Sequence, residues 1–354
     1  MIQGKYLEVK TMNKVNTSIC LMYNFVKYDK LISLINEEYK DTNTNVFNIY
    51  IDLNNLFKSL YRSNVSIDDK LDISSTILNL VGHYRHFFKT RYRVWTNIYL
   101  VYSNNIPANN ILLYPEYNAT TVKNITNNIK IANNINDNLD IIEILVKYIE
   151  DVYFVQDIYE TGVIIKYLCN NVGIEAPNLI LSRDIYNFQL VDDNTKILVP
   201  NKYNNIDSSY IVNTSNTIEH YCKKEFKSDY GSGLDGGLLS LLMSLSKCSK
   251  RNIRSLFKVS DAIKIIQSSI ASNRILNGYN TDGILKVLLP RHVDDGYLMT
   301  RFRICDIASQ YIRYINSPNI HITPNNFVNL NNPNELKNIV NKWFIKNPII
   351  LENL

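Results

Sequence analysis

The stretch that decides the fold is residues 139–191, LDIIEILVKYIEDVYFVQDIYETGVIIKYLCNNVGIEAPNLILSRDIYNFQLV. Its pattern predicts a helix, a short strand, a second helix, a loop, a strand and a turn. Apolar residues recur at helical spacing over residues 139–149 and again over 163–169. Residues 178–181 then form an apolar run that stops at the polar cluster Ser182-Arg183-Asp184. Such a cluster is typical of a buried parallel strand, whose carboxyl end delivers side chains to a site.

Two earlier apolar runs have the same character. Residues 46–53, VFNIYIDL, carry Asp52 near their end, and residues 97–102, NIYLVY, end beside Ser103. Helical patterns separate the three runs, so right-handed crossovers are needed to connect them. The sequence therefore predicts an α/β fold in which these runs are neighbouring parallel strands with helices on both faces.

This layout resembles the core of the flap endonuclease and 5'-exonuclease family, within the wider class of PIN-like nucleases. Asp52 matches the acid at the end of the family's first strand, and Asp184 matches the first acid of its Asp-x-Asp motif. Gln189-Leu190-Val191 matches the residues that follow that motif. The resemblance implies a PIN-like parallel sheet flanked by helices, followed by a helical lobe similar to a helix–three-turn–helix element.

The acids of the family's metal site are mostly replaced. Tyr186 stands at the second acid of Asp-x-Asp, Ser103 stands where the second strand of the family ends in an acid, and Tyr159 to Gly162 stand at Glu-Ala-Asp-Asp. Two-metal hydrolysis needs a cluster of carboxylates, because each divalent ion requires oxygen ligands and charge neutralisation. The sequence therefore predicts a catalytically degenerate protein that needs no cofactor.

Two interpretations of the remaining acids stay open. In the first, Asp52 and Asp184 cap neighbouring helices and any metal site is weak or vacant. In the second, Asp52, Glu160 and Asp184 form a reduced catalytic site, with Mg²⁺ or Mn²⁺ held by Asp52 and Asp184.

Other functional positions of the resemblance are also changed. In residues 114–121, YPEYNATT, Asn118 and Thr121 replace a Lys and an Arg that the family directs at the scissile phosphate. Phe257 and Val259 replace glycines of the turn that holds a potassium ion in the family. Glycine is favoured in such turns because it adopts positive φ without strain.

Basic residues in two segments are candidates for nucleic-acid binding. A basic and aromatic helix over residues 73–93 and the start of the helical lobe supply them, and they could contact phosphates and stack on bases. The alternative is that these cations are a solvated helix face. The candidates are Arg85, Lys89, Arg91 and Arg93 in the first segment, and Lys247, Lys250, Arg251, Arg254 and Lys258 in the second.

Composition sets the remaining bounds. The chain has 354 residues, 45% of them hydrophobic, which is enough for a substantial core, and its net charge of +5 gives mild support for a polyanionic partner. We divide it into an N-terminal extension (1–45), a PIN-like domain (46–215) and a mainly helical C-terminal lobe (216–354).

Several features bear on location and origin. The five cysteines are widely spaced, no apolar run is long enough for a membrane span, and the first residues lack a signal peptide. We therefore expect a cytoplasmic protein. The richness in Asn, Ile, Lys and Tyr suggests an AT-rich genome such as that of a phage, virus or endosymbiont, and a viral protein would be found in the host cytoplasm or in the virion. Its partners would be DNA or other viral proteins, and the three hypotheses are a degenerate DNA-binding relative, an active nuclease and a pure assembly protein.

Overall fold

The computed structural model describes residues 46–62, 93–103, 151–172, 176–200, 210–249, 252–271 and 295–316, with parts of helical segments within 74–89 and 135–150. Every structural statement below concerns these residues. The proposed extension 1–45 and the 114–121 segment lie outside them.

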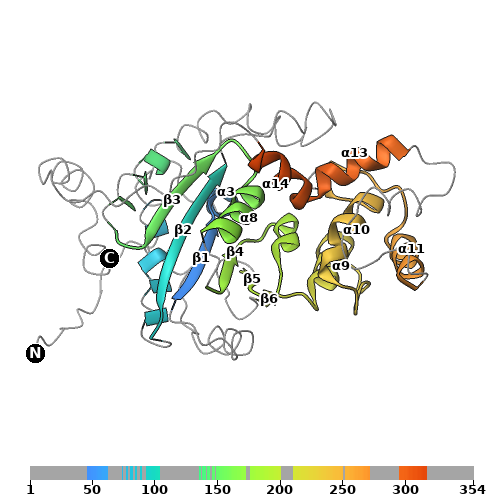
Figure 1. The fold of residues 1–354 in the computed structure, drawn as a ribbon, viewed down its shortest axis with the longest axis horizontal. Helices are drawn as coiled ribbons and strands as arrows, with labels where there is room; N and C mark the ends of the chain where they lie inside the picture. Colours follow the sequence, from blue (N-terminus) through green and yellow to red (C-terminus); the bar gives the residue numbers. More distant parts are fainter. Residues whose placement is uncertain are drawn as a thin grey trace, which may run out of the picture.

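A six-stranded sheet forms one end of the molecule (Figure 1). Its strand order is β3-β2-β1-β4-β5-β6, with β1 to β5 parallel and β6 antiparallel to β5. The strands are β1 Val46–Asp52, β2 Trp95–Ser103, β3 Val152–Asp157, β4 Asn178–Leu181, β5 Thr195–Val199 and β6 Tyr210–Val212.

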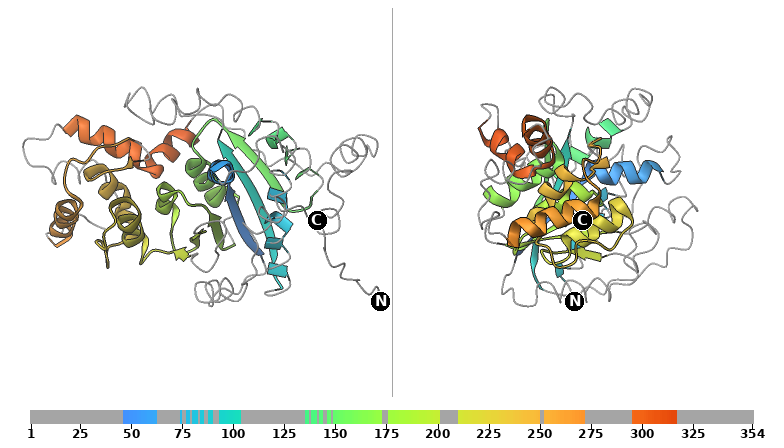
Figure 2. Two further views of the ribbon diagram at one scale, coloured as in Figure 1. Left: turned by 180° about the vertical axis from the view of Figure 1, so that it is seen from behind. Right: turned by 90° about the vertical axis from the view of Figure 1, so that its right-hand side faces the viewer.

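The helices flank the sheet and extend the molecule beyond it, as the view from behind in Figure 2 also shows. Those with defined ends are α3 Leu53–Arg62, α8 Thr161–Asn171, α9 Thr217–Phe226, α10 Leu239–Leu245, α11 Val259–Ala271, α13 Asp295–Cys305 and α14 Ile307–Ile315, with the 3-10 helices η1 Ile185–Leu190 and η3 Gly236–Leu238. None of the described helices is long and apolar enough to cross a membrane.

The predicted α/β architecture is confirmed. The runs that end at Asp52, Ser103 and Leu181 are β1, β2 and β4, which lie side by side and parallel in the order β2-β1-β4. The short strand and the helix expected after residue 149 are β3 and α8. Two further strands, β5 and β6, lie within the polar stretch 192–215, where the sequence pattern alone indicates no strand. Both strands are short and lie between polar residues, so their apolar runs are too brief to be recognised in the sequence.

Alternating strand residues build two cores, one on each face of the sheet. Tyr50, Val101 and Ile180 join the core that α8 and the helical lobe cover. Ile49, Ile51 and neighbouring strand residues join the core on the opposite face, which α3 and the helical segments within 74–89 and 135–150 cover. Successive residues of a strand point to opposite faces, and both faces are buried. This explains why these strands are nearly continuous apolar runs.

A row of polar side chains crosses four strands close to their amino ends. Asn97 Nδ2 donates to Asn48 Oδ1 at 3.1 Å, Asn48 Nδ2 donates to Asn178 Oδ1 at 3.1 Å, and Asn178 Nδ2 donates to Thr195 Oγ1 at 3.4 Å. Each of these pairs is also a register pair of its two strands. A one-residue slip would bury these groups without partners, so the row fixes the register.

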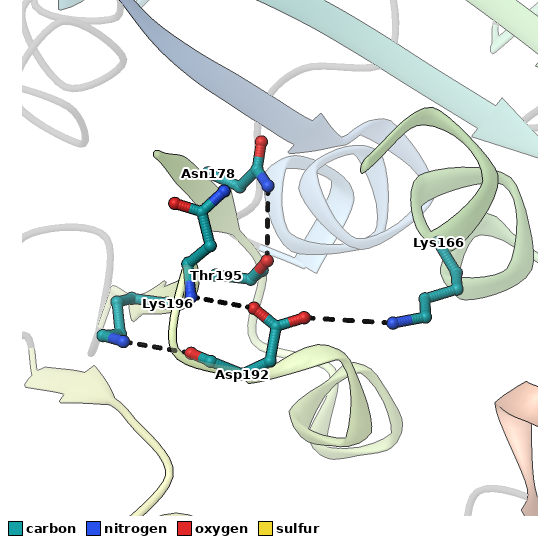
Figure 3. A network of polar contacts seen from close by, with 6 residues as sticks. Lys166, Asn178, Asp192, Thr195 and Lys196 are labelled. Carbon is teal, nitrogen blue, oxygen red and sulfur yellow. Dashed lines mark hydrogen bonds and ion pairs between the residues drawn. The ribbon is translucent and has the colours of Figure 1, made fainter. Parts of the chain in front are cut away.

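Figure 3 shows the β4–β5 end of this row. Lys196 is buried in β5, but its Nζ reaches the carbonyl oxygen of Asp192 at 3.0 Å, and the Asp192 carboxylate lies 3.9 Å from Lys166 Nζ on α8. A lysine whose ammonium reaches main-chain oxygens in this way is tolerated in a buried strand.

Replacing Asn97 with alanine should lower the free energy of unfolding by about 1 kcal/mol, because it removes a single half-buried hydrogen bond at the end of the row. Urea denaturation measures the change. Asn170→Ala, on the exposed side of α8, is the control and should shift stability by less than ~0.5 kcal/mol. Equal effects of the two substitutions would mean that the row contributes nothing specific.

The helical lobe contains the predicted helix pair. α10 and α11 are joined by the turn that carries Phe257, whose N–H donates to Leu245 O at 3.1 Å, and Val259 is the first residue of α11. Both helices share one core with α8 and the sheet. The lobe is therefore packed against the sheet, as expected for the helical part of the fold.

Candidate functional site

Acidic and polar side chains gather at the carboxyl edge of the parallel strands. Asp52 ends β1, Ser103 ends β2, Asp157 ends β3, and residues 182–184 follow β4. Glu160 lies immediately before α8, at the same edge. Because the strands are parallel, their carboxyl ends lie at the same edge of the sheet. The three acids predicted from the sequence, Asp52, Glu160 and Asp184, therefore all lie at this edge.

Asp52 is buried, and its carboxylate accepts hydrogen bonds from neutral groups. Its Oδ1 accepts from the Asn55 N–H at 3.0 Å, which caps the first turn of α3. Its Oδ2 accepts from the Ser182 hydroxyl at 2.9 Å and from Asn187 Nδ2 at 3.0 Å. A carboxylate has about four lone-pair sites, so these donors take up most of its capacity.

Asp184 also works as a cap. Its Oδ1 accepts from the Tyr186 N–H at 3.1 Å at the start of η1, and its own N–H donates to the Ser182 hydroxyl at 3.0 Å. Ser182 thus connects the loop of Asp184 to Asp52. The capping roles proposed from the sequence for both acids are present in the structure.

Glu160 is buried as the residue before α8, and its side chain makes no capping bond to that helix. The next residue, Thr161, donates from Oγ1 to Asn54 Oδ1 at 2.9 Å. Asn54 also exchanges hydrogen bonds with the backbone of Ser103, at 2.7 and 2.9 Å. Amide and hydroxyl groups therefore tie the starts of α3 and α8 to the end of β2.

Gly162 and Asn187 lie in close contact in the middle of this network. A Cβ atom on Gly162 would lie 2.6 Å from Asn187 Oδ1, closer than real Cβ atoms come to another heavy atom, and 3.0 Å from Ile307 Cδ1, which is tighter than most Cβ contacts. Asn187 is buried and held by its donation to Asp52 and to Ser182 Oγ, both at 3.0 Å. The space that a side chain at position 162 needs is therefore filled by Asn187.

Asp157 was not among the residues singled out from the sequence. Its carboxylate accepts from the Ile158 N–H at 2.5 Å and from the Tyr314 hydroxyl at 3.0 Å, which connects β3 to α14. Burial, followed by the charge of Asp157 and its hydrogen bond with the Tyr314 hydroxyl, raises the pKa of Tyr314. The feature of the sequence that could have identified Asp157 is its position directly after the apolar run VYFVQ.

The first basic segment lies away from these acids. Arg85 donates to the Glu150 carbonyl at 2.7 Å just before β3, Lys89 lies 5.3 Å from the Trp95 ring, and Arg93 is exposed just before β2. All three are at the amino ends of the strands. The structure does not bring them to the carboxyl edge, and Arg91 lies outside the described residues.

The second basic segment belongs to the turn between α10 and α11. Lys247 pairs with Glu225 at 3.7 Å, whereas Arg254 and Lys258 are exposed. Lys250 and Arg251 fall outside the described part. Lys247 is thus partly neutralised, and the exposed pair remains available for contact with an anion.

The donor set at the carboxyl edge is dominated by amides and hydroxyls. Within the described ranges, no group of three or more His, Cys, Asp or Glu side chains is arranged to hold a metal ion. The buried carboxylate of Asp52 faces neutral donors that would have to move before a cation could bind there. This arrangement suits a hydrogen-bonded joint between β1, β4, α3 and η1.

No protein-family model matches the sequence, and no curated protein matches it. Solved structures do match. The zinc-bound T5 5'-exonuclease superposes with a TM-score of 0.54 at 12% identity, over 76% of this chain and 92% of that one. The chain has the fold of the 5'-nucleases.

A second match supports the same 5'-nuclease fold. The bacteriophage T5 flap endonuclease, in a pseudo-enzyme–product complex with DNA and metal ions, superposes with a TM-score of 0.53 at 12% identity, over 87% of this chain and 98% of that one. The matches cover both the sheet and the helical lobe. At this identity the likeness establishes the PIN-like fold, and the chemistry must be argued from the residues.

Proposed function

We propose that this protein is a catalytically degenerate 5'-nuclease-like protein of viral or phage origin that binds DNA without cutting it. The contact between Gly162 and Asn187 carries the proposal. By the resemblance to the 5'-nuclease family, residue 162 occupies the position of the last acid in Glu-Ala-Asp-Asp, which belongs to the metal site. Here that position has no side chain, and a buried amide occupies the space.

Asp52 adds independent support. A metal ligand presents carboxylate oxygens to a cation, whereas Asp52 uses both oxygens to accept from Asn55, Ser182 and Asn187. Removing these partners would leave buried polar groups unsatisfied, which costs about 1–3 kcal/mol for each group. Metal binding at Asp52 would have to offset that cost in addition to dehydrating the ion.

DNA binding is the retained activity we favour over a purely structural role in viral assembly. The T5 flap endonuclease that shares the fold is seen with DNA. In this chain, Arg254 and Lys258 are exposed on the turn of the helical lobe. Phosphate contacts need only such surface cations, so binding can outlast the loss of catalysis.

Purified protein should not cut 5'-flap, nicked or single-stranded DNA in Mg²⁺ or Mn²⁺ above background. Losing one stabilising group of the transition state typically costs ~10²- to 10³-fold in rate, and several are replaced here. A cleavage time course with each metal measures this, with Asp52→Asn and Asp184→Asn as controls. Cleavage by the natural protein that both substitutions abolish would reject the proposal and support a metal-dependent nuclease with a reduced site.

A further inference from the structure

An exposed tryptophan lies at the amino edge of the sheet, at the opposite end of the strands from the acids. Trp95 is the first residue of β2 and is 56% exposed, more than any other aromatic side chain of the described residues. β3 begins opposite Ile98, so no described strand lies beside Trp95 on that side. Tryptophan is highly buried on average, so an exposed ring at an open strand end is a candidate contact surface.

Two cations flank this ring. Lys89 Nζ lies over the Trp95 ring at 5.3 Å from its centre, and Arg93 precedes Trp95 by two residues. Both cations are exposed, and within the described ranges neither forms an ion pair with a carboxylate. A ring face attracts a cation but does not neutralise its charge, so both charges remain available to an anion.

The turn that carries these cations is held in place by the core. The Val94 N–H donates to the Phe88 carbonyl oxygen at 3.4 Å, which brings the two ends of the turn together and with them Lys89 and Arg93. Phe88 is fully buried, and its ring lies 5.2 Å from that of Phe47 on β1, measured between ring centres. A ligand that binds to such an anchored backbone has less to order, which favours binding.

The acids of the amino edge lie farther along it. Asp151, directly before β3, accepts with its carbonyl oxygen from the Ile98 N–H at 2.8 Å, so its backbone lies beside Ile98 rather than beside Trp95. Glu150 precedes Asp151, and its carbonyl oxygen accepts from Arg85 at 2.7 Å. The described charges placed next to Trp95 are both positive, which complements a phosphate backbone.

We propose that Trp95, Lys89 and Arg93 form a binding site for single-stranded DNA, in which an unpaired base stacks on the Trp95 ring and the two cations contact the neighbouring phosphates. We call it the Trp95 site. It rests on the proposed DNA-binding function and adds a contact at the amino edge of the sheet. An aromatic ring accompanied by cations is the combination that holds single strands without reading their sequence. Trp95 was not among the residues singled out from the sequence.

Tryptophan fluorescence tests the stack directly. The chain has two tryptophans, Trp95 and Trp343, so in a Trp343→Phe variant all tryptophan emission comes from Trp95. Titration with a single-stranded oligothymidylate should quench that emission to a plateau, because a stacked base is in contact with the ring. A matched duplex at the same nucleotide concentration should quench less, because its bases are already stacked on one another. Unchanged emission when the single strand binds, or equal quenching by the duplex, would overturn the Trp95 site.

Substitutions measure the contribution of each group to binding of a labelled oligothymidylate. Trp95→Leu should weaken binding about tenfold, as expected for the loss of one base stack, and leave its salt dependence unchanged. Lys89→Met should reduce the salt dependence by about one ion. Lys147→Met is the matched control, because Lys147 already pairs with Glu143 at 3.4 Å, and it should match the natural protein in both. Thermal unfolding of each variant establishes that it is folded.

The two levels of failure can be told apart. If the natural protein binds neither the oligothymidylate nor the duplex, the proposed DNA-binding function itself fails. If it binds only the duplex, or if Trp95→Leu binds the single strand as well as the natural protein does, only the Trp95 site is rejected.

Discussion

Replacing Arg301 with methionine should lower the free energy of unfolding by about 3–5 kcal/mol. Arg301 is 0% exposed in α13 and is the largest fully buried side chain of the described residues. Its guanidinium donates to three main-chain carbonyls, those of Ser244 at 2.9 Å, Ser246 at 3.0 Å and Arg254 at 2.5 Å. These carbonyls belong to the end of α10 and to the turn that follows it.

The size of the effect follows from what remains after the substitution. Methionine fills much of the volume but donates no hydrogen bond, so three carbonyl oxygens would lose a charged donor in a buried place. Arg301→Lys should recover only part of the loss, because an ammonium cannot reproduce the planar fork of donors.

Chemical denaturation followed by circular dichroism measures the loss. Arg303→Met is the matched control, because Arg303 lies on the same helix but is exposed, and it should cost less than ~0.5 kcal/mol. If Arg301→Met and Arg303→Met are equally stable, the guanidinium is not what holds α13 to α10 and its turn. Limited proteolysis should show that the Arg301→Met variant is cut first within the helical lobe.

Arg301 also shows where sequence reasoning stops. The surrounding sequence, TRFRIC, predicts a helix with a mixed face, and that helix is α13. The local sequence pattern cannot predict that Arg301 is buried, because the main-chain carbonyls to which it donates are ~50 residues away in the chain.

The sheet was more predictable than the site. β1, β2 and β4 bury side chains on both faces, and this produces continuous apolar runs that a sequence reveals. β5 and β6 were missed because each is short, and because Lys196 interrupts β5 with a charge that the fold accommodates through carbonyl contacts. The positions of Asp52 and Asp184 followed from the strand ends.

What surrounds those acids could not be predicted. Asn187 lies 135 residues after Asp52, and only the fold brings its amide to the carboxylate and its Oδ1 over Gly162. Local patterns locate single residues, and the contacts that give them a role are set by tertiary structure.

Asp52→Asn should destabilise the protein by about 2–3 kcal/mol. The carboxylate accepts every hydrogen bond it makes with Asn55, Ser182 and Asn187. An asparagine presents an amide NH2 group in place of one oxygen, and on the Oδ2 side that NH2 group would face the NH2 group of Asn187, donor against donor. Asp184→Asn should change stability by less than ~0.5 kcal/mol, because asparagine caps a helix start as well as aspartate does.

The sign of this effect separates the two interpretations of the site. In a working metal centre the carboxylates repel one another until the ions bind, so neutralising one would stabilise the metal-free protein. In a hydrogen-bonded joint, the same substitution removes acceptors and destabilises. Urea denaturation in EDTA measures the sign, with Asp193→Asn, an exposed acid before β5, as the control for general charge effects.

Metal addition completes the comparison. A ligand that binds only the folded protein raises its stability by RT ln(1 + [L]/Kd), so Mg²⁺ or Mn²⁺ at ten times its Kd would add about 1.4 kcal/mol. We expect no increase for the natural protein, because both oxygens of Asp52 already accept hydrogen bonds that a metal ion would have to displace. An increase that Asp52→Asn abolishes, together with a stabilising Asp52→Asn in EDTA, would show that the carboxyl edge still holds a metal ion.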